Sequence, residues 1–99
     1  MLRLVSVVVS VALAGPAVAA SKAEDCGYQA DVVAAVQAAR VARVRERKVA
    51  AHIEGTAPEW PEKYNAVVPL VTPWVYGMKR AELRTADLAA AWKELFLQQ

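Results

Sequence analysis

Apolar side chains recur at helical spacing over most of the chain. Between residues 25 and 54 they fall three or four positions apart, and no proline interrupts them. Such a stripe is typical of an amphipathic helix that lays one side on a core. Its members are Cys26, Ala30, Val33, Val36, Ala39 or Arg40, Val44 and Ala51. We predict a long first helix that Asp25 caps and Gly55 ends.

The stretch 40–48 interrupts this pattern with charge. It holds five basic residues and one acidic residue, Glu46. The basic residues, which we call the basic cluster, are Arg40, Arg43, Arg45, Arg47 and Lys48. A bend or turn is predicted here, followed by a second short helix that carries Val49, His52 and Ile53.

Prolines divide the middle of the chain. Pro58 and Pro61 lie in residues 57–62, and each removes a backbone donor and disfavours helical geometry in the residue before it. This segment is therefore predicted to be the main connection. Pro61 followed by Glu62 is typical of a first helical turn, where proline fits and a carboxylate lies near the positive end of the helix dipole.

Helical spacing resumes at Tyr64 and continues to Met78, although Pro69 and Pro73 lie inside this segment. A kinked helix or two short helices would accommodate both prolines. The alternative is a buried strand over residues 66–75, which valine and threonine favour and the two prolines oppose.

The C-terminal segment has the clearest helical pattern. Leu88, Trp92, Leu95 and Phe96 stand at positions i, i+4, i+7 and i+8, and Thr85 is placed to cap the helix. The chain is thus predicted to be a small all-α single domain of three to four helices with a proline-kinked middle segment.

The N-terminal residues are typical of a secretory signal peptide. A basic residue precedes a run of ten mostly apolar residues, and Ala17–Ala19 forms the small-x-small pattern that signal peptidase reads. Cleavage after this pattern or one residue later makes 1–20 the signal peptide and 21–99 the mature domain. An uncleaved anchor is the alternative, although roughly 17 apolar residues interrupted by Gly-Pro are at the short limit for a membrane span. We predict a periplasmic or secreted protein.

Charge is nearly balanced over the chain. There are 12 basic and 10 acidic residues, a formal net charge of +2, and loss of Arg3 with the signal peptide lowers it further. So weak a field argues against nucleic acid as a partner. A chain this short supports one hydrophobic core.

Cys26 is the only cysteine of the chain. In an oxidising compartment a lone thiol has no partner within its own chain. Three interpretations stay open: a quiet, half-buried thiol, an intermolecular disulfide in a homodimer, or a reactive or ligand-binding group.

The set of groups suited to catalysis or metal binding is small. The mature chain has one histidine and one cysteine, whereas a structural zinc site uses four Cys or His ligands. No glycine-rich phosphate loop occurs, and no cofactor or metal is predicted. A catalytic alternative is a small glycan or cell-wall hydrolase that uses Glu59 and Glu62 on either side of Trp60. The alternative is an ordinary helix start with Trp60 packed on the core.

The candidates for partner binding are Trp60 and the basic cluster. Trp60 lies between two prolines and is predicted to be an exposed anchor, since large amphipathic rings are enriched at binding hot spots. The basic cluster suits anionic lipid headgroups in a peripheral membrane contact, an acidic partner protein or cell-wall carboxylates, although such runs are usually solvated faces. Arg40 points toward the apolar side and is expected to pair with Glu62 or Glu82.

The function predicted from the sequence is that of a small exported, non-enzymatic binding or accessory protein with a periplasmic protein as its partner. This class includes enzyme inhibitors and immunity-type proteins. The first alternative is an envelope-associated structural protein held by an uncleaved N-terminal anchor and a basic surface. The second alternative is the hydrolase that uses Glu59 and Glu62.

Overall fold

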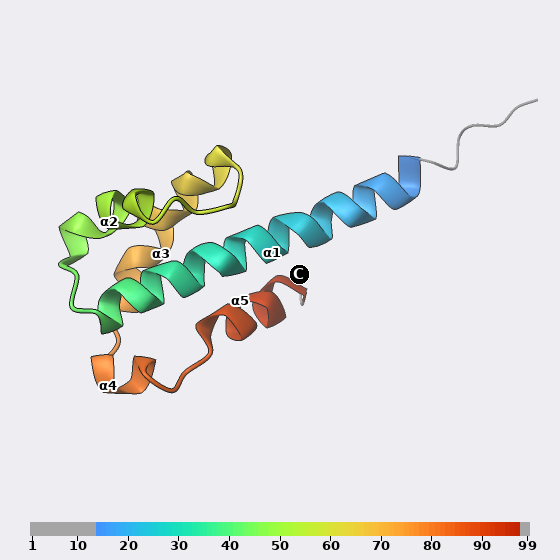
Figure 1. Cartoon of the computed structure of the whole chain (residues 1–99). Helices are drawn as coiled ribbons and strands as arrows, with labels where there is room; N and C mark the ends of the chain where they lie inside the picture. The colour runs from blue at the N-terminus through green and yellow to red at the C-terminus, as the bar shows by residue number, and fades with distance from the viewer. Residues whose placement is uncertain (1–13, 98–99) are drawn as a thin grey trace, which may run out of the picture.

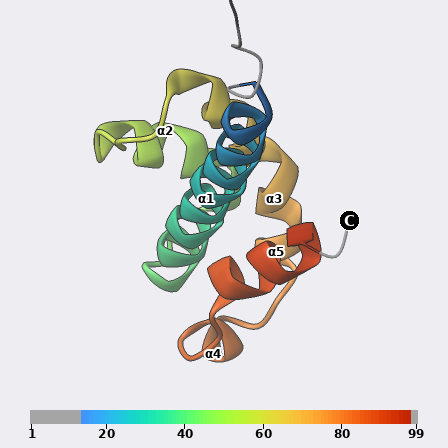
Figure 2. The same ribbon diagram turned by 90° about the vertical axis from the view of Figure 1, so that its right-hand side faces the viewer.

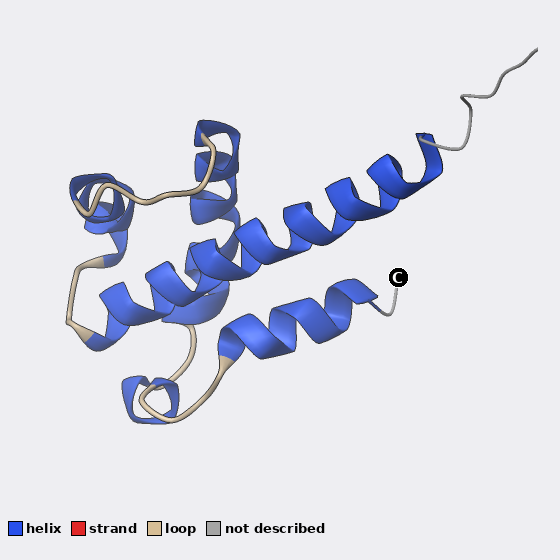
Figure 3. Ribbon diagram, turned by 45° about the vertical axis from the view of Figure 1, so that its right-hand side comes forward, coloured by secondary structure: helices blue, strands red, loops and turns tan. Residues whose placement is uncertain are grey.

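The computed structural model describes residues 14–97 of the chain and side chains within 22–96, and the secondary structure in this range is entirely helical (Figure 3). The predicted all-α class is confirmed for this part of the chain. The elements are α1 (Ala14–Val41), η2 (Glu46–Lys48), α2 (Val49–Gly55), η3 (Glu62–Ala66), α3 (Val67–Tyr76), α4 (Arg80–Leu83) and α5 (Leu88–Leu97), where η denotes a 3-10 helix. They outnumber the three or four helices predicted, because short turns separate several brief segments.

Helix α1 is the central element, and the other helices pack around it. In Figures 1 and 2, α2 and α5 lie on opposite sides of α1, and α3 packs against α1 between them. The first turns of α1 extend beyond the remaining helices (Figure 1). The buried residues of α1 in the described range lie between Cys26 and Ala39.

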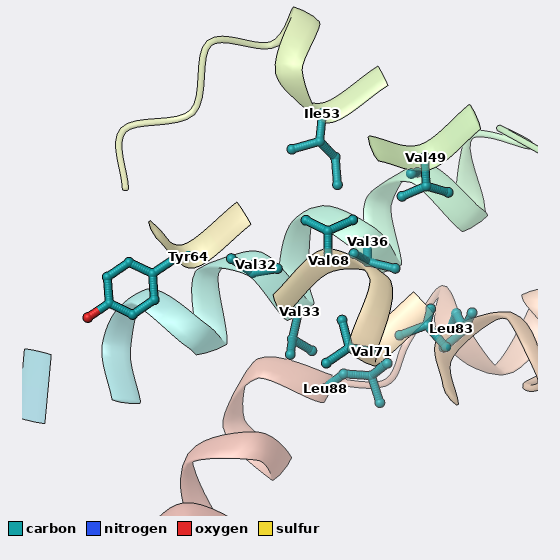
Figure 4. Close-up of a cluster of buried hydrophobic side chains, with 12 residues drawn as sticks. Val32, Val33, Val36, Val49, Ile53, Tyr64, Val68, Val71, Leu83 and Leu88 are labelled. Carbon is teal, nitrogen blue, oxygen red and sulfur yellow. The ribbon is translucent and has the colours of Figure 1, made fainter. Parts of the chain in front are cut away.

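A single cluster of buried side chains forms the core (Figure 4). Helix α1 contributes three valines and an alanine, α2 and α3 contribute two and three side chains, and η3, α4 and α5 contribute one each. The members are Val32, Val33, Val36, Ala39, Val49, Ile53, Tyr64, Val68, Val71, Val75, Leu83 and Leu88. The predicted stripe on 25–54 supplies Val33, Val36 and Ala39 to this set, but its last member, Ala51, is exposed.

The start of α1 differs from the prediction. Asp25 is not a cap but lies inside α1, which begins at Ala14. Alanine has the highest helix propensity and is frequent just before Asp25, and Pro16 falls in the first turn, where its missing donor costs little. The apolar run 4–13 of the predicted signal peptide lies outside the described residues.

The first helix does not run to Gly55 but ends at Val41, and the turn considered within residues 40–48 follows it as a Schellman motif. Val44 N–H donates to Ala39 O at 2.9 Å, and Arg43 N–H donates to Arg40 O at 3.1 Å. These bonds satisfy the last carbonyls of α1. Arg43 takes the left-handed position with φ 68°, where glycine is the usual residue.

The short helix predicted after this turn is α2, which ends at Gly55 as expected. Val49 and Ile53 are buried, whereas His52 is exposed. The connection that follows passes through Ala57, which also has a positive φ, of 51°. Pro58 comes next, where a proline stops the helix from continuing.

The proline-containing middle segment is a 3-10 helix that runs directly into an α-helix, so the strand considered for 66–75 is wrong. Pro61 is the N-cap of η3, and Glu62 is its first residue. Pro73 lies inside α3. Tyr64, Val68, Val71 and Val75 are buried at the spacing predicted.

Helix α5 begins at Leu88, and its cap is Asp87, not the predicted Thr85. Ala90 N–H donates to Asp87 Oδ1 at 3.0 Å, the usual bond between an N-cap and the third helical residue. The preceding loop is tied to α1 by Gln37, whose Nε2 donates to Leu83 O at 2.6 Å and to Ala86 O at 2.7 Å. This tertiary clamp sets the start of α5.

Candidate functional site

Helix α3 is apolar on all sides. Its sequence, VVPLVTPWVY, has no charged residue, and Thr72, its one hydroxyl apart from the C-terminal tyrosine, is buried. The inner face contacts the core, but Pro69, Leu70 and Pro73 are exposed, and Leu70 is 75 % exposed. A helix that is apolar all round is ordinarily buried all round, so the outer face of α3 is unusual for a small folded domain.

A groove of about 660 Å³ lies next to this outer face, between α3 and the η2–α2 segment. We call it the α2–α3 groove. Buried Val49 and Val68 contribute to its lining, together with the exposed Ala50, Pro69 and Pro73. The volume falls within the range of protein binding sites.

Thr72 contributes to the lining of the α2–α3 groove, but its hydroxyl is not free to bind a ligand there. The Thr72 hydroxyl donates to Val68 O at 2.6 Å within α3. This bond satisfies the hydroxyl inside its own helix. The lining supplied by α2 and α3 is therefore suited to apolar groups.

Charge is confined to the η2 end of the α2–α3 groove, where Arg45, Glu46 and Arg47 contribute to its lining. All three side chains are exposed. Arg45 is the N-cap of η2, with extended backbone at φ −67° and ψ 144°. Two guanidinium groups against one carboxylate give this end a positive balance.

Arg40 is separated from the α2–α3 groove by its packing. Its guanidinium lies 5.2 Å from the centre of the Tyr76 ring, and its Nη2 donates to Met78 O at 3.3 Å. The hydrogen bond thus goes to a backbone carbonyl and not to the predicted Glu62 or Glu82. Arg40 Nε is buried without a hydrogen-bond partner. Arg40 links α1 to the end of α3.

Tyr76 connects the same region to the turn after α1. Its hydroxyl donates to Val44 O at 2.6 Å. Burial raises the pKa of the Tyr76 hydroxyl. The nearby positive charge of Arg40 lowers this pKa, but by less than burial raises it. The hydroxyl therefore stays protonated and available as a donor at neutral pH.

The other members of the basic cluster diverge. Arg43 is exposed in the turn after α1, and Lys48 is exposed at the end of η2. Arg80, the first residue of α4, lies near Arg43 and near Arg84, the C-cap of α4, a grouping that the sequence did not reveal. Burial, together with Arg43, Arg84 and Arg40, lowers the pKa of Arg80, whose Nε donates to Val41 O at 3.3 Å.

Trp60 is half-buried against the core, contrary to the predicted exposed anchor. Its Nε1 donates to Asn65 Oδ1 at 2.8 Å, which ties the ring to η3. Glu59 and Glu62 are exposed on either side. With its N–H engaged and its ring partly covered, Trp60 is a packing residue of the connection.

A smaller recess of about 250 Å³ lies where α1 meets η3. Tyr64 donates a hydrogen bond to Asp25 Oδ1, and the Tyr28 and Tyr64 ring centres are 5.0 Å apart. The bond to Asp25, followed by burial, raises the pKa of Tyr64 to about 12. The contact attaches η3 to α1.

Cys26 lies close by on α1 and is buried and free, with 6 % of its surface exposed. A disulfide to a second chain would require the packing around α1 to open. The intermolecular disulfide through Cys26 therefore stays a prediction.

Two further properties concern the described part of the chain. Within it, no group of three or more His, Cys, Asp or Glu side chains is arranged to hold a metal ion. Likewise, none of its described helices combines the length and apolar character needed to cross a membrane.

Comparison with protein families, curated proteins and solved structures gives no match to this chain. The functional argument therefore rests on the geometry of the α2–α3 groove and the exposed face of α3.

Proposed function

We propose that this is a small exported, non-enzymatic binding protein that contacts a partner protein through the α2–α3 groove and the outer face of α3. The observation that carries the proposal is the exposure of Pro69, Leu70 and Pro73 on a helix that has no charged residue. Contiguous apolar surface on a small domain marks interaction sites. Export, inferred from the N-terminal signal, would place the partner in the periplasm or outside the cell.

The chemistry of the groove supports binding more than catalysis. Its lining from α2 and α3 is apolar, and the hydroxyl of Thr72 is satisfied within its helix. Catalysis by acid and base needs titratable groups held against a substrate. Glu59 and Glu62, the carboxylates of the hydrolase hypothesis, are exposed in a different part of the chain and are absent from the groove lining.

A single substitution at the lining tests whether a partner binds in the groove. Ala50 is an exposed residue of α2 that lines the groove, so Ala50→Glu places a carboxylate in apolar surroundings. Ala51 is the next residue of the same helix, is also exposed and does not line the groove. Ala51→Glu is therefore a matched control with the same change in charge and helix propensity.

Intact mass spectrometry of native complexes tests the proposal. The tagged protein is purified from its natural host under non-reducing conditions as wild type, Ala50→Glu and Ala51→Glu. We expect wild type and Ala51→Glu to lack the first 19 or 20 residues and to carry one stoichiometric protein partner, which Ala50→Glu has lost.

Two results would contradict the proposal. A partner retained by all three proteins would place binding elsewhere on the surface. A full-length chain recovered only from membranes would favour the anchored structural protein instead.

A further inference from the structure

We infer that the occupant of the α2–α3 groove is an amphipathic α-helix of the partner protein, with carboxylates beside its apolar face. This inference rests on the proposed function and specifies the chemistry of its partner. Three features of the groove carry it: its lining, its walls and the charge at its η2 end.

The lining selects one of the usual modes of peptide recognition. Addition of a strand needs a sheet edge, and the described residues form helices only. Proline-rich peptides bind in aromatic grooves, but the lining from α2 and α3 consists of Val49, Ala50, Val68, Pro69, Thr72 and Pro73. Docking of an amphipathic helix is the mode that uses an apolar groove between helices, and the lining from α2 and α3 has this character.

The walls suit a helix as occupant. Both α2 and α3 border the groove, and a third helix packs between two others when its ridges of side chains enter their grooves. The exposed Leu70 and Pro73 continue the apolar surface along α3. A partner helix with apolar residues at i, i+3, i+4 and i+7 would contact the groove and this face together.

The charge at the η2 end specifies the flank of the occupant. Arg45 and Arg47 are exposed there, and Glu46 offsets only one of them. A partner with Asp or Glu at this end gains complementary contacts, whereas a basic helix meets two like charges. Arg43, Arg80 and Arg84 add positive charge near the preceding turn, which strengthens the long-range attraction of an acidic partner.

The test is selection from a displayed library of random peptides, each roughly 15 residues long to allow four helical turns. Wild type is the bait, and each enriched peptide is then measured against Ala50→Glu, Ala51→Glu, Arg45→Glu, Arg47→Glu and Lys93→Glu. Lys93 is exposed on α5 and controls for the change in overall charge. Binding is followed by calorimetry, and circular dichroism reports whether the peptide becomes helical.

We expect acidic peptides with helical apolar spacing to be enriched. Ala50→Glu should weaken them at least about tenfold, because it places a charge in apolar surroundings. Arg45→Glu and Arg47→Glu should each weaken binding roughly threefold, and added salt should do the same. Ala51→Glu and Lys93→Glu should leave binding unchanged.

The possible failures separate the inference from the proposed function. Enriched peptides that Ala50→Glu weakens, but that are basic or non-helical, would overturn the inference and leave the groove as a binding site. Peptides that bind Ala50→Glu as tightly as wild type would overturn both. A third outcome is that no peptide is enriched. If wild type then sediments with anionic phospholipid vesicles and Ala50→Glu does not, the groove binds a membrane. If wild type instead forms a dimer that Ala50→Glu abolishes, the groove binds a second copy of the chain.

Discussion

Helices α3 and α5 are each ten residues long and both pack on α1, yet their outer faces differ. Helix α5 exposes the charged Lys93 and Glu94 beside Leu95, whereas α3 exposes Leu70 and two prolines and has no charged residue. The two helices also touch each other, with the ring centres of Trp74 and Trp92 6.0 Å apart. The two helices thus have similar apolar inner faces, but the outer face of α5 carries charged residues and that of α3 does not.

The difference separates what folding requires from what it does not. A helix on the surface of a small domain needs one apolar face, and the exposed side of α5 carries two charged residues beside Leu95. The outer face of α3 contributes nothing to the core, and its exposure carries a cost in solubility. Its apolar character is explained if a partner covers it.

The largest expected effect is on the inner face of α5. Leu88 is buried with 6 % exposure, so Leu88→Ala should lower the free energy of unfolding by about 3 kcal/mol through lost burial and a cavity. Leu95, which is 55 % exposed on the same helix, should cost less than about 0.5 kcal/mol when replaced by alanine. Urea unfolding followed by circular dichroism measures both. Equal losses would mean that Leu95 packs in solution.

The same pair of changes on α3 should separate its two faces. Val71 is 2 % exposed, and Val71→Ala should cost about 2 kcal/mol of unfolding free energy. Its neighbour Leu70 is 75 % exposed, and Leu70→Ala should change stability by less than about 0.5 kcal/mol. A large loss on Leu70→Ala in the isolated chain would show that this face already has a partner within the fold.

A smaller effect, of opposite sign, is expected at the turn that leads to the α2–α3 groove. Arg43 has φ 68°, a region where a side chain costs up to about 1 kcal/mol and glycine costs little. Arg43→Gly should therefore stabilise the protein by up to about 1 kcal/mol. Arg45, at φ −67°, provides the control. Arg45→Gly relieves no strain and only increases the flexibility of the unfolded chain, so it should lower stability. Destabilisation by Arg43→Gly in thermal unfolding would contradict the left-handed turn.

Two hydrogen bonds that attach other elements to α1 should respond differently to pH: the bond from Tyr64 of η3 to Asp25 and the bond from Trp92 of α5 to Gln29. Tyr64 has its pKa raised to about 12 in the fold, from 10.0 when free, so its protonated form is favoured by folding. Its contribution to stability is complete below pH 10 and is lost as pH rises toward 12. On the other side, Trp92 Nε1 donates to Gln29 Oε1 at 3.1 Å, and neither group titrates there.

Unfolding free energies measured across this alkaline range test the difference. The stability lost by wild type between pH 10 and 12 should exceed that lost by Tyr64→Phe, which retains the ring but has no titrating hydroxyl. Gln29→Met should lose the same amount as wild type. Parallel curves for wild type and Tyr64→Phe would refute the role of the Asp25 contact.

Sequence patterns predicted the inner faces better than the ends of the helices. The apolar stripe through Val33 and Val36, and the one through Val68 and Val71, follow directly from helical spacing and are buried as expected. The helix ends depend on competition among local signals. Thr85 and Asp87 are both good caps, and the clamp of Gln37 on Leu83 and Ala86 favours a start at Leu88.

The candidate site was only partly within reach of the sequence. Arg45 and Arg47 were identified by their charge, but the groove they border is formed by α2 and α3, which only tertiary packing brings together. Trp60 was expected to be exposed because it lies between prolines, yet Asn65 and the core hold it. The sequence does contain one signal of the apolar outer face of α3, since no residue between Lys63 and Lys79 is charged.

Site-specific photo-crosslinking in the natural host tests the central claim most directly. A photoreactive amino acid replaces Leu70 on the outer face of α3 in one strain and Glu94 on the outer face of α5 in another, since both residues are exposed. We predict one discrete protein adduct from position 70, none from position 94, and loss of the adduct when Ala50→Glu is added. No adduct from position 70, or the same adduct from both positions, would contradict the claim.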